Sequence, residues 1–180
     1  MRIIGGIYKS RLIEMVKSNE TRPTMDKVRG SIFNIIGPYL DGGIALDLFS
    51  GTGAMGLEAI SRGALYSYFV DISNSAIATT KKNISSLNVT HKAHVLKMDY
   101  QNALNYFAKN KIQFDYVFLD PPYKMNIISE IIHFIEKNNL LKKDGLIIAE
   151  YDKEFMLSCD LRVIKDTIYG IRKVTVFKGE

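Results

Sequence analysis

From Ile44 onward the chain repeats one pattern, in which a short apolar run is followed by a longer segment with helical spacing. This alternation predicts parallel strands joined by crossover helices, because parallel neighbours need a long connection that returns to the same end of the sheet. Near the C-terminus two apolar runs lie too close together for a helix between them, which predicts an antiparallel hairpin at one edge. The expected fold is therefore an α/β domain with a mostly parallel, seven-stranded sheet and helices on both faces.

The segment before Ile44 differs from this pattern. Weak alternation over residues 1–20 predicts a short hairpin or a pair of strands. A helix capped by Thr24 is expected to run to about Gly37-Pro38, with Val28, Ile32, Ile35 and Ile36 on one face. Asp41-Gly42-Gly43 is a break, so we expect an N-terminal extension of residues 1–42 ahead of a domain of residues 43–180. The predicted strands of that domain are Ile44–Phe49, Tyr66–Val70, His94–Leu96, Tyr116–Leu119, Leu146–Ala149, Arg162–Lys165 and Lys173–Lys178, and its predicted helices are Ala54–Arg62, Ser73–Leu87, Tyr100–Lys109 and Ile127–Glu136.

A glycine-rich turn follows the first of these strands. Residues Asp47–Gly56 contain Gly-x-Gly-x-x-Gly, in which the glycines permit a tight turn and let a ligand approach the backbone. That spacing alone is a weak signal, but Asp47 just ahead of it narrows the choice. A carboxylate there would repel the diphosphate of a dinucleotide, whereas it suits a ligand with a cationic amino-acid end and a sulfonium, such as S-adenosylmethionine.

Acids also follow the next three predicted strands, at Asp71, Asp99 and Asp120. The carboxyl ends of parallel strands meet at one edge of the sheet, where ligands of open α/β sheets bind. Asp71 is placed to accept hydrogen bonds from both ribose hydroxyls. Asp99 is placed to accept one from the adenine amine, to cap the following helix, or to do both. The expected cofactor-binding residues are Asp47, Phe49, Ser50, Gly51, Thr52, Gly53, Asp71, Ile72, Met98, Asp99 and Asp120.

The fourth strand stops at the sequence Asp120-Pro121-Pro122-Tyr123. Proline fixes its own φ and has no N–H, so the pair forms a stiff corner that cannot extend the sheet. A carboxylate, a backbone carbonyl and an aromatic ring are thereby expected at the ligand-binding edge. The hypothesis is that Asp120 and the Pro121 carbonyl accept the two hydrogens of an exocyclic amine, while Tyr123 stacks on the base.

The formal net charge of +5 comes mainly from the N-terminal segment. The first 30 residues contain seven Lys and Arg against three acids, whereas the remaining 150 contain 17 against 16. Such a segment suits a polyanionic partner, although a solvated basic arm would have the same composition. The candidate RNA contacts are Lys9, Arg11, Arg22, Arg29, Pro122 and Tyr123.

The composition also argues against several other classes of protein. The single cysteine, Cys159, cannot form an internal disulfide, and no Cys/His cluster suggests zinc. No apolar stretch is long enough to span a bilayer, and the chain does not start with the apolar core of a signal peptide. We therefore expect a cytoplasmic protein, acting as a monomer, without a metal or a membrane partner.

Two groups of motifs resemble known methyltransferases. The glycine turn, Asp71 and the Asp-Pro-Pro-Tyr sequence resemble class I S-adenosylmethionine-dependent methyltransferases, which have a Rossmann-like fold and act on exocyclic amines of nucleobases. Arg2–Gly6, Arg22–Arg29 and Leu46–Ala59 look more specifically like the RsmD family of bacterial enzymes. This resemblance implies methyl transfer to N2 of one guanine in 16S rRNA, in the small ribosomal subunit or its assembly intermediate. It also implies that residues 22–29 cover the cofactor or the base.

Three alternatives remain open at this stage. The same Asp-Pro-Pro-Tyr chemistry serves methylation of adenine N6 in DNA or RNA, or of glutamine in a protein, although a chain of 180 residues has little room for a DNA-recognition domain. A non-catalytic module that binds S-adenosylmethionine is disfavoured by the intact series of acids. A dinucleotide oxidoreductase is disfavoured by Asp47 and by the Asp-Pro-Pro-Tyr sequence.

Overall fold

The computed structural model describes residues 1–16, 26–122 and 125–180 of the 180-residue chain. The described helices are α1 (Asp26–Ile36), α2 (Ala54–Arg62), α3 (Asn74–Ser86), α4 (Tyr100–Lys109) and α5 (Ile128–Lys137), with a 3₁₀ turn at Thr90–Lys92. The described strands are β1 (Ile44–Asp47), β2 (Tyr66–Asp71), β3 (Ala93–Lys97), β4 (Phe114–Leu119), β5 (Leu141–Asp152), β6 (Arg162–Tyr169) and β7 (Arg172–Lys178).

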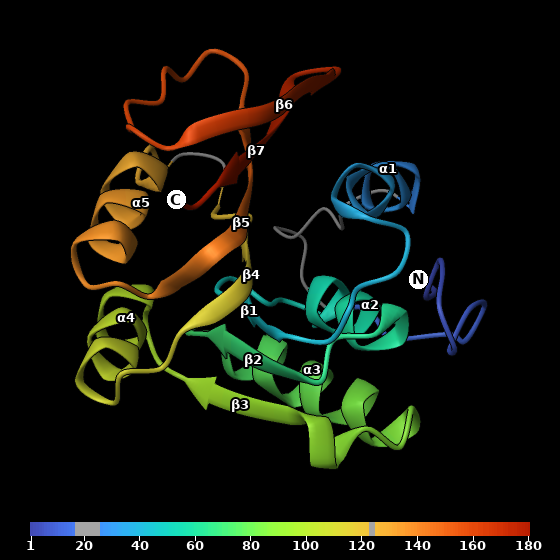
Figure 1. Ribbon diagram of the computed structural model, residues 1–180. Helices are drawn as coiled ribbons and strands as arrows, with labels where there is room; N and C mark the ends of the chain where they lie inside the picture. The colour runs from blue at the N-terminus through green and yellow to red at the C-terminus, as the bar shows by residue number, and fades with distance from the viewer. Residues whose placement is uncertain (17–25, 123–124) are drawn as a thin grey trace.

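These seven strands form one sheet in the order β3-β2-β1-β4-β5-β7-β6 (Figure 1). The first five strands pair in parallel, and β7 is antiparallel to both β5 and β6. The predicted Rossmann-like fold, with its antiparallel edge hairpin, is thus confirmed. The order reverses at β1, because the chain builds outward through β2 and β3 and then returns to place β4 on the other side. Such a switch point leaves a crevice beyond the carboxyl ends of β1 and β4.

Helices cover both faces of the sheet, with α4 and α5 on one side and α1, α2 and α3 on the other (Figure 1). Alternate residues of β4 face opposite sides of the sheet. Val117 and Leu119 pack with α4 and α5, while Phe118 packs with α1. This two-sided burial explains why the central strands are continuous apolar runs rather than alternating ones. Within the described ranges, no helix is both long and apolar enough to cross a membrane.

Strands β5 and β6 are longer than the sequence predicts. The polar residues Lys143–Gly145, which lie ahead of the predicted strand Leu146–Ala149, are inside β5, where Asp144 has a φ of 60° and the pairing with β4 shifts register. Lys178 of β7 forms a 2.7 Å ion pair with Asp144 at this irregularity. The strand therefore continues past a local irregularity. In the sequence, the polar residues at this point resemble a turn that precedes the strand.

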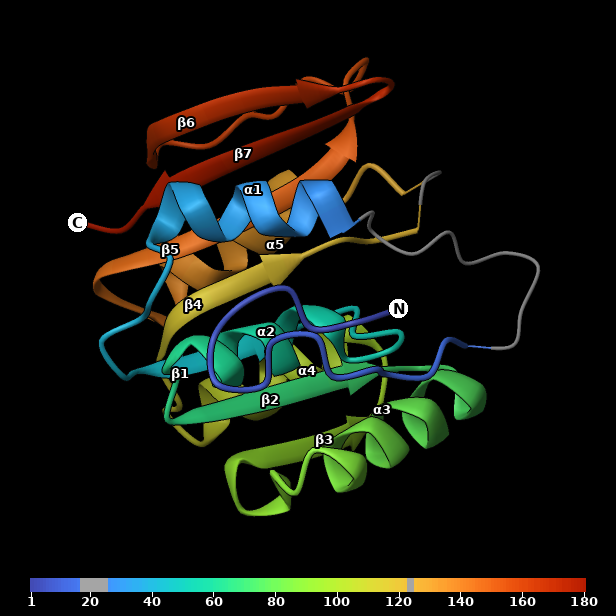
Figure 2. The same cartoon turned by 90° about the vertical axis from the view of Figure 1, so that its right-hand side faces the viewer.

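The N-terminal segment is a loop rather than a pair of strands. Between its two arms, Arg2 and Leu12 form a single isolated antiparallel bridge. Figure 2 shows this loop lying over α2, and Ile3 and Ile13 are buried in one cluster with Leu57 of that helix. The predicted hairpin is thus present only in a short form, in which the Ile3, Ser10 and Ile13 N–H groups donate across the two arms and packing on α2 adds to these bonds. The proposed cap Thr24 lies outside the described residues.

Candidate active site

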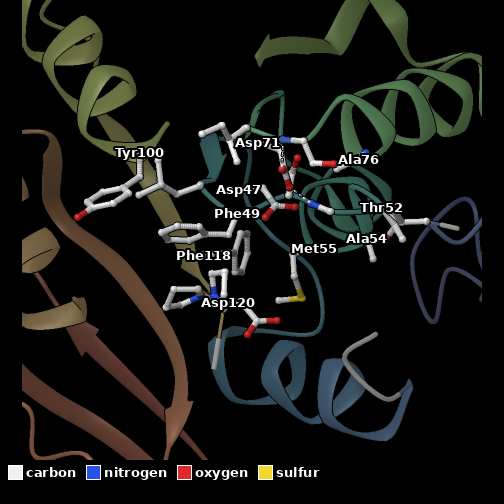
Figure 3. Close-up of a pocket in the computed structure, with 18 of the residues that line it drawn as sticks. Asp47, Phe49, Thr52, Ala54, Met55, Asp71, Ala76, Tyr100, Phe118 and Asp120 are labelled. Atoms are coloured by element: carbon white, nitrogen blue, oxygen red, sulfur yellow. Dashed lines mark hydrogen bonds between the residues drawn. The ribbon is translucent and has the colours of Figure 1, made fainter. Parts of the chain in front are cut away.

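A cavity of about 640 Å³ lies beyond the carboxyl ends of the parallel strands. Its walls come from the segments that follow β1, β2, β3 and β4, together with residues of α2, α3 and the N-terminal loop (Figure 3). Of the eleven cofactor-binding residues that the sequence predicts, ten line this cavity and Gly53 does not. A cavity of this size is in the range that small-molecule cofactors occupy.

Neighbouring strands and α3 hold the glycine loop in place. The Gly51 N–H donates to Oδ2 of Asp71 at 2.8 Å, and the Ser50 N–H donates to the carbonyl of Val70. From α3, Thr80 Oγ1 donates to the Gly51 carbonyl at 3.0 Å, and Asn83 Nδ2 donates to the Thr52 carbonyl at 2.9 Å. Hydrogen bonds from β2 and α3 to the N–H and carbonyl groups of residues 50–52 therefore hold the loop in one conformation.

The later glycines of the motif serve helix placement. Gly53 has a left-handed φ of 79° and is the residue immediately before α2. At Gly56 a Cβ atom would come within 2.4 Å of Phe69 Cε1 and 2.6 Å of Ser67 Oγ, both on β2. Only glycine lets α2 lie this close to the sheet, so Gly56 positions the helix. The loop residues that line the cavity are 50–52.

Asp47 is the buried acid of the site. It is 4% exposed, and its Oδ2 accepts the Gly56 N–H at 3.0 Å. Burial raises the pKa of Asp47 from 3.8 to about 7, opposed by the Gly56 hydrogen bond and reinforced by the nearby carboxylates of Asp120 and Asp71. Figure 3 shows Asp47 between Asp71 and Asp120. A cationic ligand group here would relieve the repulsion among three acids.

Two more of the strand-end acids, Asp71 and Asp99, are held by backbone N–H groups. Oδ1 of Asp71 accepts the Ser73 N–H at 2.8 Å, while its Oδ2 holds Gly51. Asp99 lines the cavity and also caps α4, because its Oδ1 accepts the Asn102 N–H at 2.8 Å. That hydrogen bond is the main cause that holds the pKa of Asp99 below its ordinary value. The predicted capping of α4 by Asp99 is therefore confirmed, and the same residue lies in the cavity wall.

The corner after β4 lies at another part of the same cavity. Asp120 is half-buried, Pro121 is buried and Pro122 is exposed, and all three line the cavity. Their placement follows from β4 ending beside β1, with Asp47 and Phe118 as register partners. Tyr123 lies outside the described residues.

The structure adds several lining residues that sequence reasoning missed. Tyr100 lines the cavity near the end that Asp99 occupies, and its ring centroid is 5.8 Å from that of Phe49, which the sequence had predicted. Arg172 reaches the cavity from β7, and Met1 reaches it from the N-terminal loop. No local motif marks these positions, since only the strand order and the packing of the loop bring them to the site.

The basic residues of the N-terminal part differ in their surroundings. Lys9 and Arg11 are exposed, and Arg11 Nη2 donates to the Ser86 carbonyl at 2.9 Å. Arg29 is fully buried, pairs with Asp26 at 3.0 Å and lies 3.4 Å from Glu58 of α2. The expectation that Arg29 contacts RNA is at odds with this placement, because its guanidinium faces internal partners. Arg22 lies outside the described residues.

Comparison with known proteins identifies the family. Residues 1–178 match the family model described as "Conserved hypothetical protein 95". "Ribosomal RNA small subunit methyltransferase D" of Haemophilus influenzae is 34% identical over 86% of this chain and 80% of the relative. The chain belongs to this RsmD family. The Bacillus subtilis protein YlbH is 43% identical over 99% of this chain and 98% of its own length.

A solved structure agrees with the RsmD assignment at the level of the fold. A conserved hypothetical protein from Streptococcus pyogenes superposes with a TM-score of 0.80 at 39% identity, covering 85% of this chain and 96% of that one. The family resemblance drawn from the sequence motifs is therefore confirmed over nearly the whole chain.

Proposed function

We propose that this RsmD-family protein transfers a methyl group from S-adenosylmethionine to the exocyclic N2 amine of a guanine in 16S rRNA. The observation that carries the proposal is the convergence of Asp47, Asp71 and Asp120, from three neighbouring strand ends, on one cavity. The names of the relatives supply the substrate class, the small-subunit rRNA.

The residues of the cavity fit S-adenosylmethionine better than a dinucleotide. The buried Asp47 favours a cationic group and disfavours a diphosphate. Asp71 has two carboxylate oxygens, each with further accepting capacity beyond its backbone N–H, at the place where ribose hydroxyls are expected. When bound, the cofactor supplies a methyl group on a positively charged sulfur.

Asp120 and Pro121 act on the nucleophile. The lone pair of the guanine 2-amino group is delocalised into the ring, so this nitrogen attacks poorly unless it is held and oriented. Acceptance of its two hydrogens by the Asp120 carboxylate and the Pro121 carbonyl fixes its direction and stabilises the positive charge that develops on nitrogen. The nitrogen forms its bond to the methyl carbon, the carbon–sulfur bond breaks, and the amine then loses one proton to solvent.

The N-terminal part, residues 1–42, covers the cofactor and contacts RNA in this proposal. Met1 and Val16 line the cavity, which supports the covering role. The exposed side chains of Lys9 and Arg11 support the second, because cations on a surface contact phosphates in a salt-dependent way. Arg22, Pro122 and Tyr123 remain predicted RNA contacts.

The experiment is transfer of labelled methyl groups from S-adenosylmethionine to small-subunit particles and to naked 16S rRNA, followed by nucleoside analysis. The expected product is N2-methylguanosine, and comparison of the two substrates shows whether an assembled particle is required. Asp120→Ala should reduce transfer by at least about 1,000-fold while cofactor affinity changes little. Label found as N6-methyladenosine, or only in protein, would refute the proposal.

A further inference from the structure

Arg172 lines the cavity but has no role in the proposed methyl transfer. It is the first residue of β7 and lines the same cavity as Asp120 and Pro122. Its side chain is only 12% exposed, so it is a cavity residue rather than a surface arginine. Because β5 lies between β4 and β7 in the sheet, Arg172 approaches Asp120 from across that strand.

Glu150 of β5 lies between these two groups. Its Oε1 is 3.9 Å from Nε of Arg172, and its side chain is 11% exposed. Glu150 and Asp120 also line one small hollow next to the cavity, together with Met55 and Phe118. Adjacent strands β4, β5 and β7 thus bring a carboxylate, a second carboxylate and a guanidinium to one end of the site.

The charges at this end favour a neutral base edge over a phosphate. A phosphate placed on Arg172 would lie close to Glu150 and near Asp120, whose carboxylates repel it. A neutral ligand that offers donors to the two acids and an acceptor to the arginine meets no such repulsion. A guanidinium has five N–H donors, so Arg172 can hold Glu150 and still donate to a ligand.

The Watson–Crick edge of guanine has this pattern. It presents the 2-amino group and the N1–H as donors and O6 as an acceptor, and flipped bases are commonly read along that edge. We propose that Glu150 accepts the N1–H and Arg172 donates to O6, while Asp120 holds the amine, so that Glu150 and Arg172 select guanine. Adenine presents an acceptor at N1, which would face the Glu150 carboxylate. This inference rests on the proposed function and deepens it.

The test uses 16S rRNA in which the methylated position, once mapped, carries either guanine or 2-aminopurine. 2-Aminopurine keeps the 2-amino group but has no O6 and presents an acceptor at N1. The wild-type protein should prefer guanine by roughly 100-fold in kcat/KM, since the analogue leaves charged groups of the site unmatched. In Glu150→Gln the amide can donate to N1 of the analogue, so this preference should fall by about tenfold or more.

Arg172→Met should affect methylation of guanine and not that of 2-aminopurine. It should lower kcat/KM for guanine by about 30-fold, because the hydrogen bond to O6 is lost. The kcat/KM for 2-aminopurine should stay within about twofold, because the analogue has no O6 and never makes that hydrogen bond. Lys178→Gln is the matched control: Lys178 is at the other end of β7, is ion-paired with Asp144 at 2.7 Å, and should not affect either base. Thermal melts and cofactor binding check that each variant is folded, and Arg172→Lys replaces Arg172→Met if the latter is not.

The outcomes separate this inference from the function it rests on. If the wild-type protein forms no N2-methylguanosine, the proposed function itself fails. If it does, but Glu150→Gln and Arg172→Met change both bases by the same factor, the pair is structural and the selection hypothesis is overturned. An equal loss on both bases with a shallower salt dependence would instead identify Arg172 as a phosphate contact, which also overturns it.

Discussion

Replacement of Asp47 by asparagine should stabilise the protein without its cofactor and weaken its cofactor binding. Asparagine is nearly the same size as aspartate and retains an oxygen that can accept the Gly56 N–H, so the packing of α2 is preserved. What the substitution removes is a carboxylate that is 4% exposed and close to two others. The effect is therefore electrostatic and must depend on pH.

The magnitude follows from the shifted pKa. Unfolding returns Asp47 from a pKa of about 7 to its ordinary 3.8. Since the folded protein holds this proton more tightly, its stability is unaffected below pH 3.8, falls as the pH rises toward 7, and is constant above that. At about 1.4 kcal/mol per pH unit, the full penalty is about 4 kcal/mol at pH 8. Asparagine carries no such penalty.

Urea unfolding between pH 5 and pH 8, without cofactor, measures this difference. The free energy of unfolding of Asp47→Asn should exceed that of the wild type by an amount that grows by up to about 1.4 kcal/mol per pH unit and levels off above pH 7. Asp41→Asn removes an exposed aspartate just before β1 and serves as the control with no such growth. A gap that stays constant with pH, or a variant less stable at every pH, would refute the reasoning.

Cofactor affinity should show the complementary dependence. A cationic ligand favours ionised Asp47, so wild-type binding of S-adenosylmethionine should weaken about tenfold from pH 8 to pH 6. In Asp47→Asn the affinity should be lower at pH 8 and nearly independent of pH. Isothermal titration at each pH provides the measurement, and wild-type affinity that does not vary with pH would show that no cation is bound beside Asp47.

Two further substitutions test how α2 is held in place. Gly56→Ala should destabilise the protein by about 2 kcal/mol or more in urea unfolding, because the new methyl group would overlap Phe69; an unchanged midpoint would show that the helix can shift freely. Glu58→Gln should cost about 3 kcal/mol, since the fully buried Glu58 carboxylate pairs with Arg29 and Arg62, and trypsin should then cleave within residues 1–16 faster than in the wild type. Unaltered trypsin cleavage would mean that Glu58 does not hold the N-terminal loop.

The sequence predicted the sheet and most of the cavity because both depend on local patterns. Apolar runs mark buried strands, and the strand order places the acid after each run at a shared edge. Asp47, Asp71, Asp99 and Asp120 could therefore be assigned to one cavity before any contact was known. Even the capping of α4 by Asp99 followed from its place just ahead of a helix.

The expectations that failed depended on partners distant in the sequence. Arg29 resembles a solvent-exposed cation in a basic segment, and only its contact with Glu58 of α2 shows that it is internal. The first arm of the N-terminal loop has strand-like alternation, yet it forms only one bridge to the second arm, and Ile3 is buried against α2 as well as against Ile13. Arg172 reaches the cavity only because β7 inserts between β5 and β6. These contacts depend on the order of the strands and on packing between distant segments, and the local spacing of apolar residues predicts neither.

Helix α2 connects the two walls of the cavity. Near its start, the Gly56 N–H binds the Asp47 carboxylate of β1. Two residues further on, the carboxylate of Glu58 accepts the N–H groups of Ile4 and Gly5 at 2.8 Å and 2.7 Å, which fixes the loop that brings Met1 to the cavity. Any shift of α2 would therefore move Asp47 and the N-terminal loop, both of which line the cavity, together. The close approach that Gly56 permits thus sets the position of both walls, which explains why this glycine is needed although it does not line the cavity.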